Sequence, residues 1–273
     1  MSRRATFNTA EAIMRRIKEG RGQGDGPNYK PWYRVKDVPS LGRRHRIYSV
    51  KFGRVMHELS DLERNAKFVS EILRKVIKNH EQYPHPLART QAIARELGYK
   101  HPKAPGARCD NFITTDQVWF LNTPAIQPVF IKYTEKLLDR RVQEKRTIEE
   151  VSWARWESSI PILPLKDFTE FTVNQTFVAN WDLIRDTLRP DYFDHFPEKL
   201  ADRVDDCVAG IAAEGMATLD EISEFAAAKL RLPQAQVLTG IHFLIASLRW
   251  GVDLEASPLV PFLPLTFCSL NEP

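Results

Sequence analysis

The fold is decided by residues 15–63, which read RRIKEGRGQGDGPNYKPW (15–32), VPSLGRRHRIYS (38–49) and KFGRVMHELSDLE (51–63). Glycine and arginine crowd the first half without a helix or strand period, so residues 20–46 are predicted to form a loop or arm. HRIYSV (45–50) and GRVMHELS (53–60) are typical of short strands. The block closes on Ser60-Asp61-Leu62-Glu63, a capping box that predicts a helix over residues 62–74.

The flanking sequence alternates helical and extended patterns. Helices are expected at 6–20 (with Thr9 as N-cap and Gly20 as stop), 88–98 and 138–159, and strands at 74–84, 111–121, 128–137 and 159–165. This alternation predicts a mixed α/β domain over residues 1–166, whose basic N-terminal arm spans residues 1–55.

From residue 167 to 273 the pattern is mostly helical, with expected helices at 177–188, 197–215, 218–230 and 233–251. The last two are joined by a tight turn, as in a helix-turn-helix, and residues 251–267 could form a wing of two strands. We therefore expect a second, winged-helix-like domain of α class.

The net charge of +4 hides an asymmetry between the two parts. Residues 1–60 carry a net charge of +9, residues 61–170 carry +3, and residues 171–273 carry −8. A basic front favours a polyanion such as DNA as partner, and an acidic rear favours protein. No apolar run is long enough for a membrane span or a signal peptide, and three scattered cysteines form no framework. These features predict a cytoplasmic protein without a membrane partner.

Three chemical groups stand out in separate elements of the front domain. Glu63 opens a helix, Asp116 lies in the aromatic strand NFITTDQVWFL, and Lys132 lies in the next strand, PVFIKY. Two carboxylates and a backbone carbonyl can hold a divalent cation, and a nearby lysine can orient water or stabilise charge. The set is typical of metal-dependent phosphodiester hydrolysis.

Each of these residues also has a structural interpretation. Glu63 at the third position of a Ser-x-x-Glu box can simply bond the helix N-terminus. Lys132 alone would be an ordinary exposed edge lysine. Asp116 is harder to explain by structure, because an acid inside a strand is disfavoured unless it is solvated or functional.

The three blocks quoted at the start resemble the N-terminal signature of the TnsA endonucleases, and EQYP (81–84), GYKHP (98–102) and TTD (114–116) extend the resemblance. The resemblance implies a type II restriction-endonuclease-like nuclease domain followed by a winged-helix-like domain. It implies cleavage of the non-transferred 5′ strands at transposon ends, alongside a TnsB-like transposase and a TnsC-like AAA+ ATPase. The ATPase would bind through the C-terminal domain.

The same resemblance assigns the site residues. Glu63, Asp116 and Lys132 match the family's catalytic residues, and Mg²⁺, with Mn²⁺ as a substitute, would be held by Glu63, Asp116 and the Ile131 carbonyl. A further acid falls on either Glu149 or Glu150. The chain departs from the restriction-nuclease pattern at Phe130, where an acid or amide two residues before the lysine would be usual.

The basic arm is expected to contact DNA phosphates through seven residues, Arg15, Arg16, Lys18, Arg21, Arg43, Arg44 and Arg46. Two other functions stay open. One is a stand-alone restriction or repair nuclease on the same fold. The other, motivated by Phe130, is a DNA-binding adaptor whose catalytic site has decayed.

Overall fold

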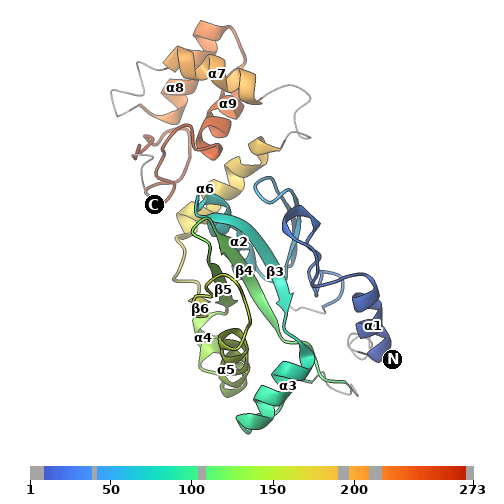
Figure 1. Cartoon of the computed structure of the whole chain (residues 1–273). Helices are drawn as coiled ribbons and strands as arrows, with labels where there is room; N and C mark the ends of the chain where they lie inside the picture. Colours follow the sequence, from blue (N-terminus) through green and yellow to red (C-terminus); the bar gives the residue numbers. More distant parts are fainter. Residues whose placement is uncertain (1–8, 39–41, 104–108, 190–196, 209–216, 269–273) are drawn as a thin grey trace. The chain divides into compact units, whose positions relative to one another are not determined.

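A computed structural model describes residues 9–38, 42–103, 109–189, 197–208 and 217–268. The chain divides into two compact units, Met1–Thr172 and Val173–Pro273. The first is mixed α/β and the described part of the second is mostly helical (Figure 1). The division falls later than the expected boundary after residue 166, because the strand β6 (Lys166–Phe168) completes the sheet of the first unit.

The main sheet of the first unit has the order β3-β4-β5-β6. Strand β3 (Val76–Pro84) pairs antiparallel with β4 (Thr114–Leu121), which forms a hairpin with β5 (Ile126–Ile131). Strand β6 then adds to β5 in the parallel direction. The hairpin was expected from two aromatic and β-branched runs separated by the turn NTPA, and it brings residues 116 and 132 to the same region of the sheet.

Helices pack against the two faces of this sheet (Figure 1). Alternate residues of a strand point to opposite faces. Val118 and Phe130 therefore pack with Trp153 of α5 (Arg140–Ala154), whereas Gln117 reaches the backbone of α2 (Asp61–Ile72). Helix α3 (Leu87–Glu96) packs through Ile93 and Ala94 against Ile148 of α5. The sheet is thus held between α2 on one face and α5 on the other.

The arm is structured over its described residues. Helix α1 (Ala10–Lys18) begins at the N-cap Thr9, as expected, and is followed by the short helix η1 (Gly26–Asn28). A separate two-stranded sheet, β1 (His45–Ser49) with β2 (Arg54–Glu58), leads into α2. Gly22 has a φ of +74°, and a side chain there would collide with the ring of Pro84 in β3. The arm therefore lies directly against the main sheet.

The second unit begins with α6 (Gln175–Ile184) and the 3-10 helix η2 (Arg185–Leu188). Helices α7 (Pro197–Val208), α8 (Leu219–Leu230) and α9 (Gln234–Ala246) follow, and Thr218 with Glu221 forms the expected capping box of α8. Gly240 lets α9 approach Leu200 and Val204 of α7 closely, since a Cβ there would lie 3.3 Å from each side chain.

Three local expectations were wrong. Residues 134–137 form the helix α4 (Thr134–Leu137) and do not continue β5. The last strand lies at 166–168, after the prolines of segment 159–165, which contributes one bridge, Ile126 to Ile162. Segment 251–267 does not form the expected pair of strands: one bridge, Val252 to Phe267, joins two of its residues, and Pro264 bridges to Thr218 outside it. The predicted helix residues 6–8 and 209–215 lie outside the described ranges. None of the described helices is long and apolar enough to cross a membrane.

Candidate active site

A cavity of about 330 Å³ lies in the first unit, where the arm, the start of α2 and the β4–β5 hairpin meet. All three expected catalytic residues line it: Glu63, Asp116 and Lys132. The rest of its wall comes from the arm, β3, the segment before β4, and α5, through Tyr33, Val38, Leu59, Gln82, Pro102, Asn111, Phe112, Ile113, Thr114 and Lys145. The structure therefore brings together three residues that are far apart in the sequence.

Asp116 and Lys132 are joined directly across the hairpin. The carboxylate oxygen Oδ2 of Asp116 accepts hydrogen bonds from the Lys132 ammonium at 2.9 Å and from the backbone N–H of Ile131 at 2.8 Å. The same ammonium donates to the Ile131 carbonyl at 2.6 Å. A positive charge thus already lies between two of the groups expected to bind a cation, Asp116 and the Ile131 carbonyl.

The charge on Lys132 is stabilised by its neighbours. Burial would favour the neutral amine, but the negative charges of Asp116 and Glu63 outweigh it and raise the pKa of Lys132 above its usual value. The ammonium is therefore fully protonated at neutral pH. In this state Lys132 can stabilise negative charge or hold a water molecule, but it cannot act as a base.

Glu63 keeps its capping role and faces the cavity as well. Its backbone N–H donates to the Ser60 hydroxyl, while its carboxylate accepts from the Ser60 hydroxyl at 3.2 Å and from the Leu59 N–H at 3.0 Å. Burial and the nearby charge of Asp116 raise the pKa of Glu63 to about 7. Both interpretations of this residue are thus compatible with one geometry.

The structure distinguishes Glu149 from Glu150. Glu150 is 48% exposed and forms an ordinary surface ion pair with Arg146 at 3.0 Å. Glu149 is fully buried, and among the described residues neither of its carboxylate oxygens has a hydrogen bond of normal geometry. Burial raises its pKa to about 8, Lys145 opposes this rise, and Asp116 adds to it. Glu149 is therefore the acid of this helix that lies close enough to Asp116 and Lys132 for their charges to act on its pKa.

Phe130 occupies the position where a ligand was expected. Its ring is buried in the core cluster with Val118 and Trp153, and its centroid lies 5.0 Å from the Lys132 ammonium. The ring therefore supports the lysine by packing and by a cation–π contact. It offers no atom to a metal ion.

The charges of this cavity fit a divalent cation. Across the described ranges no three His, Cys, Asp or Glu side chains form a ready-made metal cluster. Yet burial raises the pKa of Glu63 to about 7 and that of Glu149 to about 8, and the negative charge of Asp116 adds to both shifts. A bound cation would stabilise the charged form of these buried carboxylates. Carboxylate and carbonyl oxygens are also the ligands that Mg²⁺ prefers. Glu63, Asp116 and the Ile131 carbonyl would hold the ion.

Of the cavity residues outside the expected set, two carry polar groups close to the acids of the site. Gln82 in β3 donates from its side-chain amide to the Glu63 carboxylate at 3.2 Å. Lys145 lies one helical turn before Glu149 on α5, and within the described residues its ammonium makes no hydrogen bond or ion pair. Gln82 lies in the EQYP segment of the resemblance, and the spacing of four between Lys145 and Glu149 places both on one helix face. The EQYP segment and the four-residue spacing were therefore signals in the sequence for Gln82 and Lys145.

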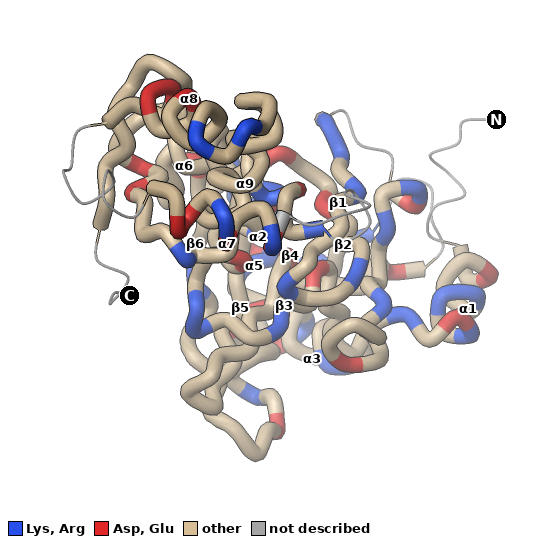
Figure 2. The backbone as a smooth tube through the Cα atoms, turned by 90° about the horizontal axis from the view of Figure 1, so that it is seen from above, with Lys and Arg blue, Asp and Glu red and all other residues tan. Residues whose placement is uncertain are grey.

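The basic arm divides into buried and exposed residues. Arg16 and Arg21 are only 1% and 3% exposed, and Arg21 is bound to Glu19, Asp37 and the Trp32 carbonyl. These two side chains stabilise the arm and cannot reach DNA in this structure. The exposed candidates are Arg15, Lys18, Arg43, Arg44 and Arg46. Figure 2 shows basic positions on α1 and beside β1, with acidic positions among them.

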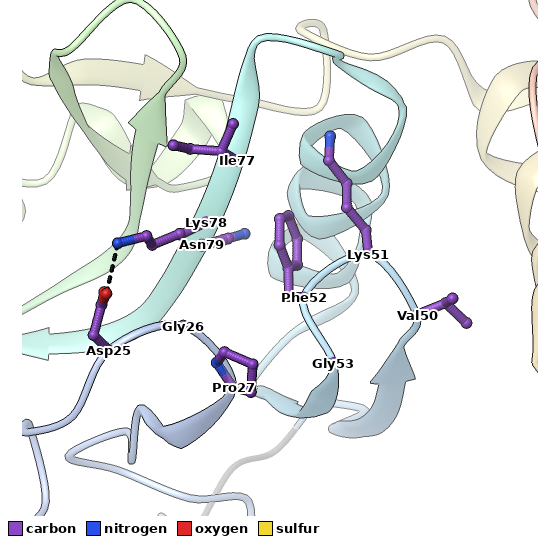
Figure 3. Close-up of a pocket in the computed structure, with 10 residues that line it drawn as sticks. All are labelled: Asp25, Gly26, Pro27, Val50, Lys51, Phe52, Gly53, Ile77, Lys78 and Asn79. Carbon is purple, nitrogen blue, oxygen red and sulfur yellow. Dashed lines mark hydrogen bonds and ion pairs between the residues drawn. The ribbon is translucent and has the colours of Figure 1, made fainter.

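A second cavity of about 360 Å³ lies between the η1 turn, the β1–β2 turn and β3 (Figure 3). Its basic residues are already engaged. Lys78 pairs with Asp25 at 2.6 Å, and Lys51 donates to three carbonyls at the end of α2. This cavity therefore lacks the combination of acids and available cations that the first cavity has.

Comparison with known proteins identifies a relative of part of this chain. No family model matches the chain. The chain is 38% identical over 170 residues to the transposon Tn7 transposition protein TnsA of Escherichia coli. This match covers 62% of the present chain and 60% of that protein, so the chain spans less than two thirds of the length of the relative.

Proposed function

We propose that this chain belongs to the TnsA endonuclease family and is a Mg²⁺-dependent DNA endonuclease of a Tn7-like transposition system, because it is 38% identical over 170 residues to the TnsA protein of transposon Tn7. It cleaves the 5′ strands at transposon ends, together with a TnsB-like transposase and a TnsC-like ATPase. The observation that supports this proposal is the convergence of Glu63, Asp116 and Lys132 on one cavity.

The proposal extends to the two units. The first is a restriction-endonuclease-like domain, since its site is built on a helix and a β-hairpin that present two acids and a lysine. The second is a winged-helix-like domain, supported by the α8–α9 pair and its tight turn. Its surplus of acidic residues disfavours DNA, so we assign it to contact with the ATPase.

In this proposal each residue has a physical role. A bound Mg²⁺ would supply charge neutralisation for the phosphate and an activated water. Glu63 and Asp116 would hold the ion together with the Ile131 carbonyl. Lys132 exchanges its contact with Asp116 for one with the phosphate, whose developing charge it stabilises. Glu149 retains a proton at neutral pH, because burial raises its pKa to about 8.

The test uses transposon-end DNA with the two partner proteins. Asp116→Ala and Lys132→Ala should abolish 5′-strand nicking and leave 3′-strand cutting by the partner unchanged. Lys136→Ala is the matched control, because this lysine follows the same hairpin and its side chain is 62% exposed. If either variant nicks the 5′ strand at the wild-type rate, the assignment of that residue to the catalytic site is wrong. Nicking by the purified chain without partners would favour a stand-alone nuclease instead.

One observation favours a second function, a DNA-binding adaptor without catalysis. Phe130 offers no metal ligand, and the described acids do not form a complete cluster. An adaptor should bind no Mg²⁺ or Mn²⁺, even with DNA present. Calorimetry distinguishes the two proposals, and Phe130→Gln should then improve metal binding in the nuclease only.

A further inference from the structure

Gln82 has an unusual backbone conformation for a residue inside a strand. Its φ is +50°, in the left-handed region that non-glycine residues rarely adopt. The register pairs Glu81 with Gln117 and Tyr83 with Thr115, so Gln82 lies opposite Asp116 in the ladder. Such a conformation persists only where surrounding contacts impose it, and it is frequent at functional sites.

The side chain of Gln82 links two residues of the candidate active site. Its amide Nε2 donates to Oε2 of Glu63 at 3.2 Å, and its Oε1 accepts from the Thr114 hydroxyl at 3.0 Å. The Thr114 contact fixes the amide, since Oε1 is bound and Nε2 must then face the carboxylate. Only the Leu59 N–H is otherwise seen to bind Oε2 of Glu63 among the described residues. Gln82 is 3% exposed, so water competes weakly for these bonds.

The backbone of Gln82 is held by the arm. Its carbonyl accepts a hydrogen bond from the Trp32 N–H at 3.2 Å. Two residues further along β3, Pro84 packs against Gly22 with no room for a side chain. The arm thus holds the backbone of Gln82 in its positive-φ conformation, and this conformation directs the side-chain amide at Glu63.

We infer that Gln82 is a positioning residue that orients the Glu63 carboxylate for metal binding. The inference rests on the proposed function, in which Glu63 binds Mg²⁺. Gln82 acts through Glu63 and through its link to Thr114, without touching the reacting phosphate.

The test is Gln82→Asn on the full chain, read by calorimetry with Mn²⁺ as the probe, with and without a short DNA duplex. Asparagine tolerates a positive φ, so the strand should keep its shape, but its amide is one methylene too short to reach Glu63. We expect Mn²⁺ affinity to fall about tenfold, as for other groups that orient a metal ligand. In cleavage assays kcat should fall while KM for DNA stays within about twofold.

Gln91→Asn is the matched control. Gln91 also donates from its amide to a carboxylate, that of Asp110 at 2.8 Å, but it lies outside the cavity. Its variant should bind Mn²⁺ like the wild type. If Gln82→Asn lowers the melting temperature strongly, Gln82→Met replaces it, because methionine keeps the length and removes the donor.

A double-mutant cycle with Glu63→Gln separates positioning from a general structural effect. In the Glu63→Gln background Gln82→Asn should change the remaining Mn²⁺ affinity by less than twofold. An equal loss in both backgrounds would overturn the inference. Wild-type Mn²⁺ binding by Gln82→Asn would overturn it while leaving the proposed function intact. If the wild-type chain shows no Mn²⁺ binding that depends on Asp116, the proposed function fails and the inference with it.

Discussion

The buried carboxyl of Glu149 should make the first unit less stable as the pH rises. Its pKa in the folded chain is about 8, against 4.5 for an exposed glutamate. At a pH between these two pKa values, the folded chain therefore keeps a proton on Glu149 that the unfolded chain releases. Stability is lost progressively across this window and stays constant above it. Replacing the acid by an uncharged isostere, Glu149→Gln, should remove this loss.

The pKa shift sets the magnitude. At about 1.36 kcal/mol per pH unit, the rise from 4.5 to about 8 corresponds to roughly 5 kcal/mol as an upper limit. Relaxation and water entry reduce such values, and we expect a gain of about 2 kcal/mol for Glu149→Gln at pH 9 without metal. For a unit of this size the gain corresponds to a melting temperature about 4–8 °C higher. At pH 5 the two proteins should be nearly equal.

The assay is thermal unfolding followed by circular dichroism in chelator at pH 5 and pH 9. Glu150→Gln is the control, because this neighbour is exposed and forms a surface ion pair with Arg146. It should shift stability by less than about 0.5 kcal/mol at either pH. The reasoning is refuted if Glu149→Gln is no more stable than wild type at pH 9, or if its gain is the same at pH 5.

Three further predictions concern the same unit. Lys132→Met should reduce the cleavage rate about a hundredfold or more. The variant should bind Mn²⁺ more tightly in calorimetry, because the ammonium no longer occupies Asp116 and the Ile131 carbonyl. Weaker Mn²⁺ binding would contradict this prediction. Mn²⁺ at a hundredfold excess over Kd should stabilise the wild type by about 2.7 kcal/mol, which is measured as a rise in melting temperature. The melting temperature of Asp116→Asn should not change. Arg21→Ala should cost about 3 kcal/mol in urea unfolding, because its buried acid partner is left unpaired, whereas Arg15→Ala at the surface should cost less than about 0.5 kcal/mol.

Local signals predicted most helices and strands well. The N-caps Thr9 and Ser60 and the capping box at Thr218 mark helix starts in the structure. Such signals work because a cap satisfies backbone groups of its own first turn, without help from distant residues. Gly98, with a φ of +69°, likewise follows the end of α3 as expected.

Strand ends were harder to predict because partners elsewhere in the chain determine them. The apolar segment 159–165 reads as a strand, but Pro161 and Pro164 have no N–H to donate to a ladder. Regular pairing with β5 starts only at Lys166. At the other end, β5 stops at Ile131, and Lys132 turns its side chain to Asp116.

The candidate site was predictable in its main residues and not in its supporting ones. Glu63, Asp116 and Lys132 were named from the sequence and share one cavity. The choice of Glu149 over Glu150 needed the rotation of α5, and the importance of Gln82 needed its backbone angle. Likewise, composition cannot distinguish a buried arginine such as Arg21 from an exposed one such as Arg43, so composition alone predicts a uniformly accessible arm.

The close contact between Gly22 and Pro84 has a consequence for exchanging parts between relatives. The arm and β3 are complementary surfaces, and Trp32 bonds the strand at Gln82. A chimera that takes its arm from one homologue and its sheet from another would join surfaces that did not evolve together. Recombination breakpoints should therefore be tolerated after Pro84 and not between the arm and the strand, and the two segments should covary when related sequences are aligned.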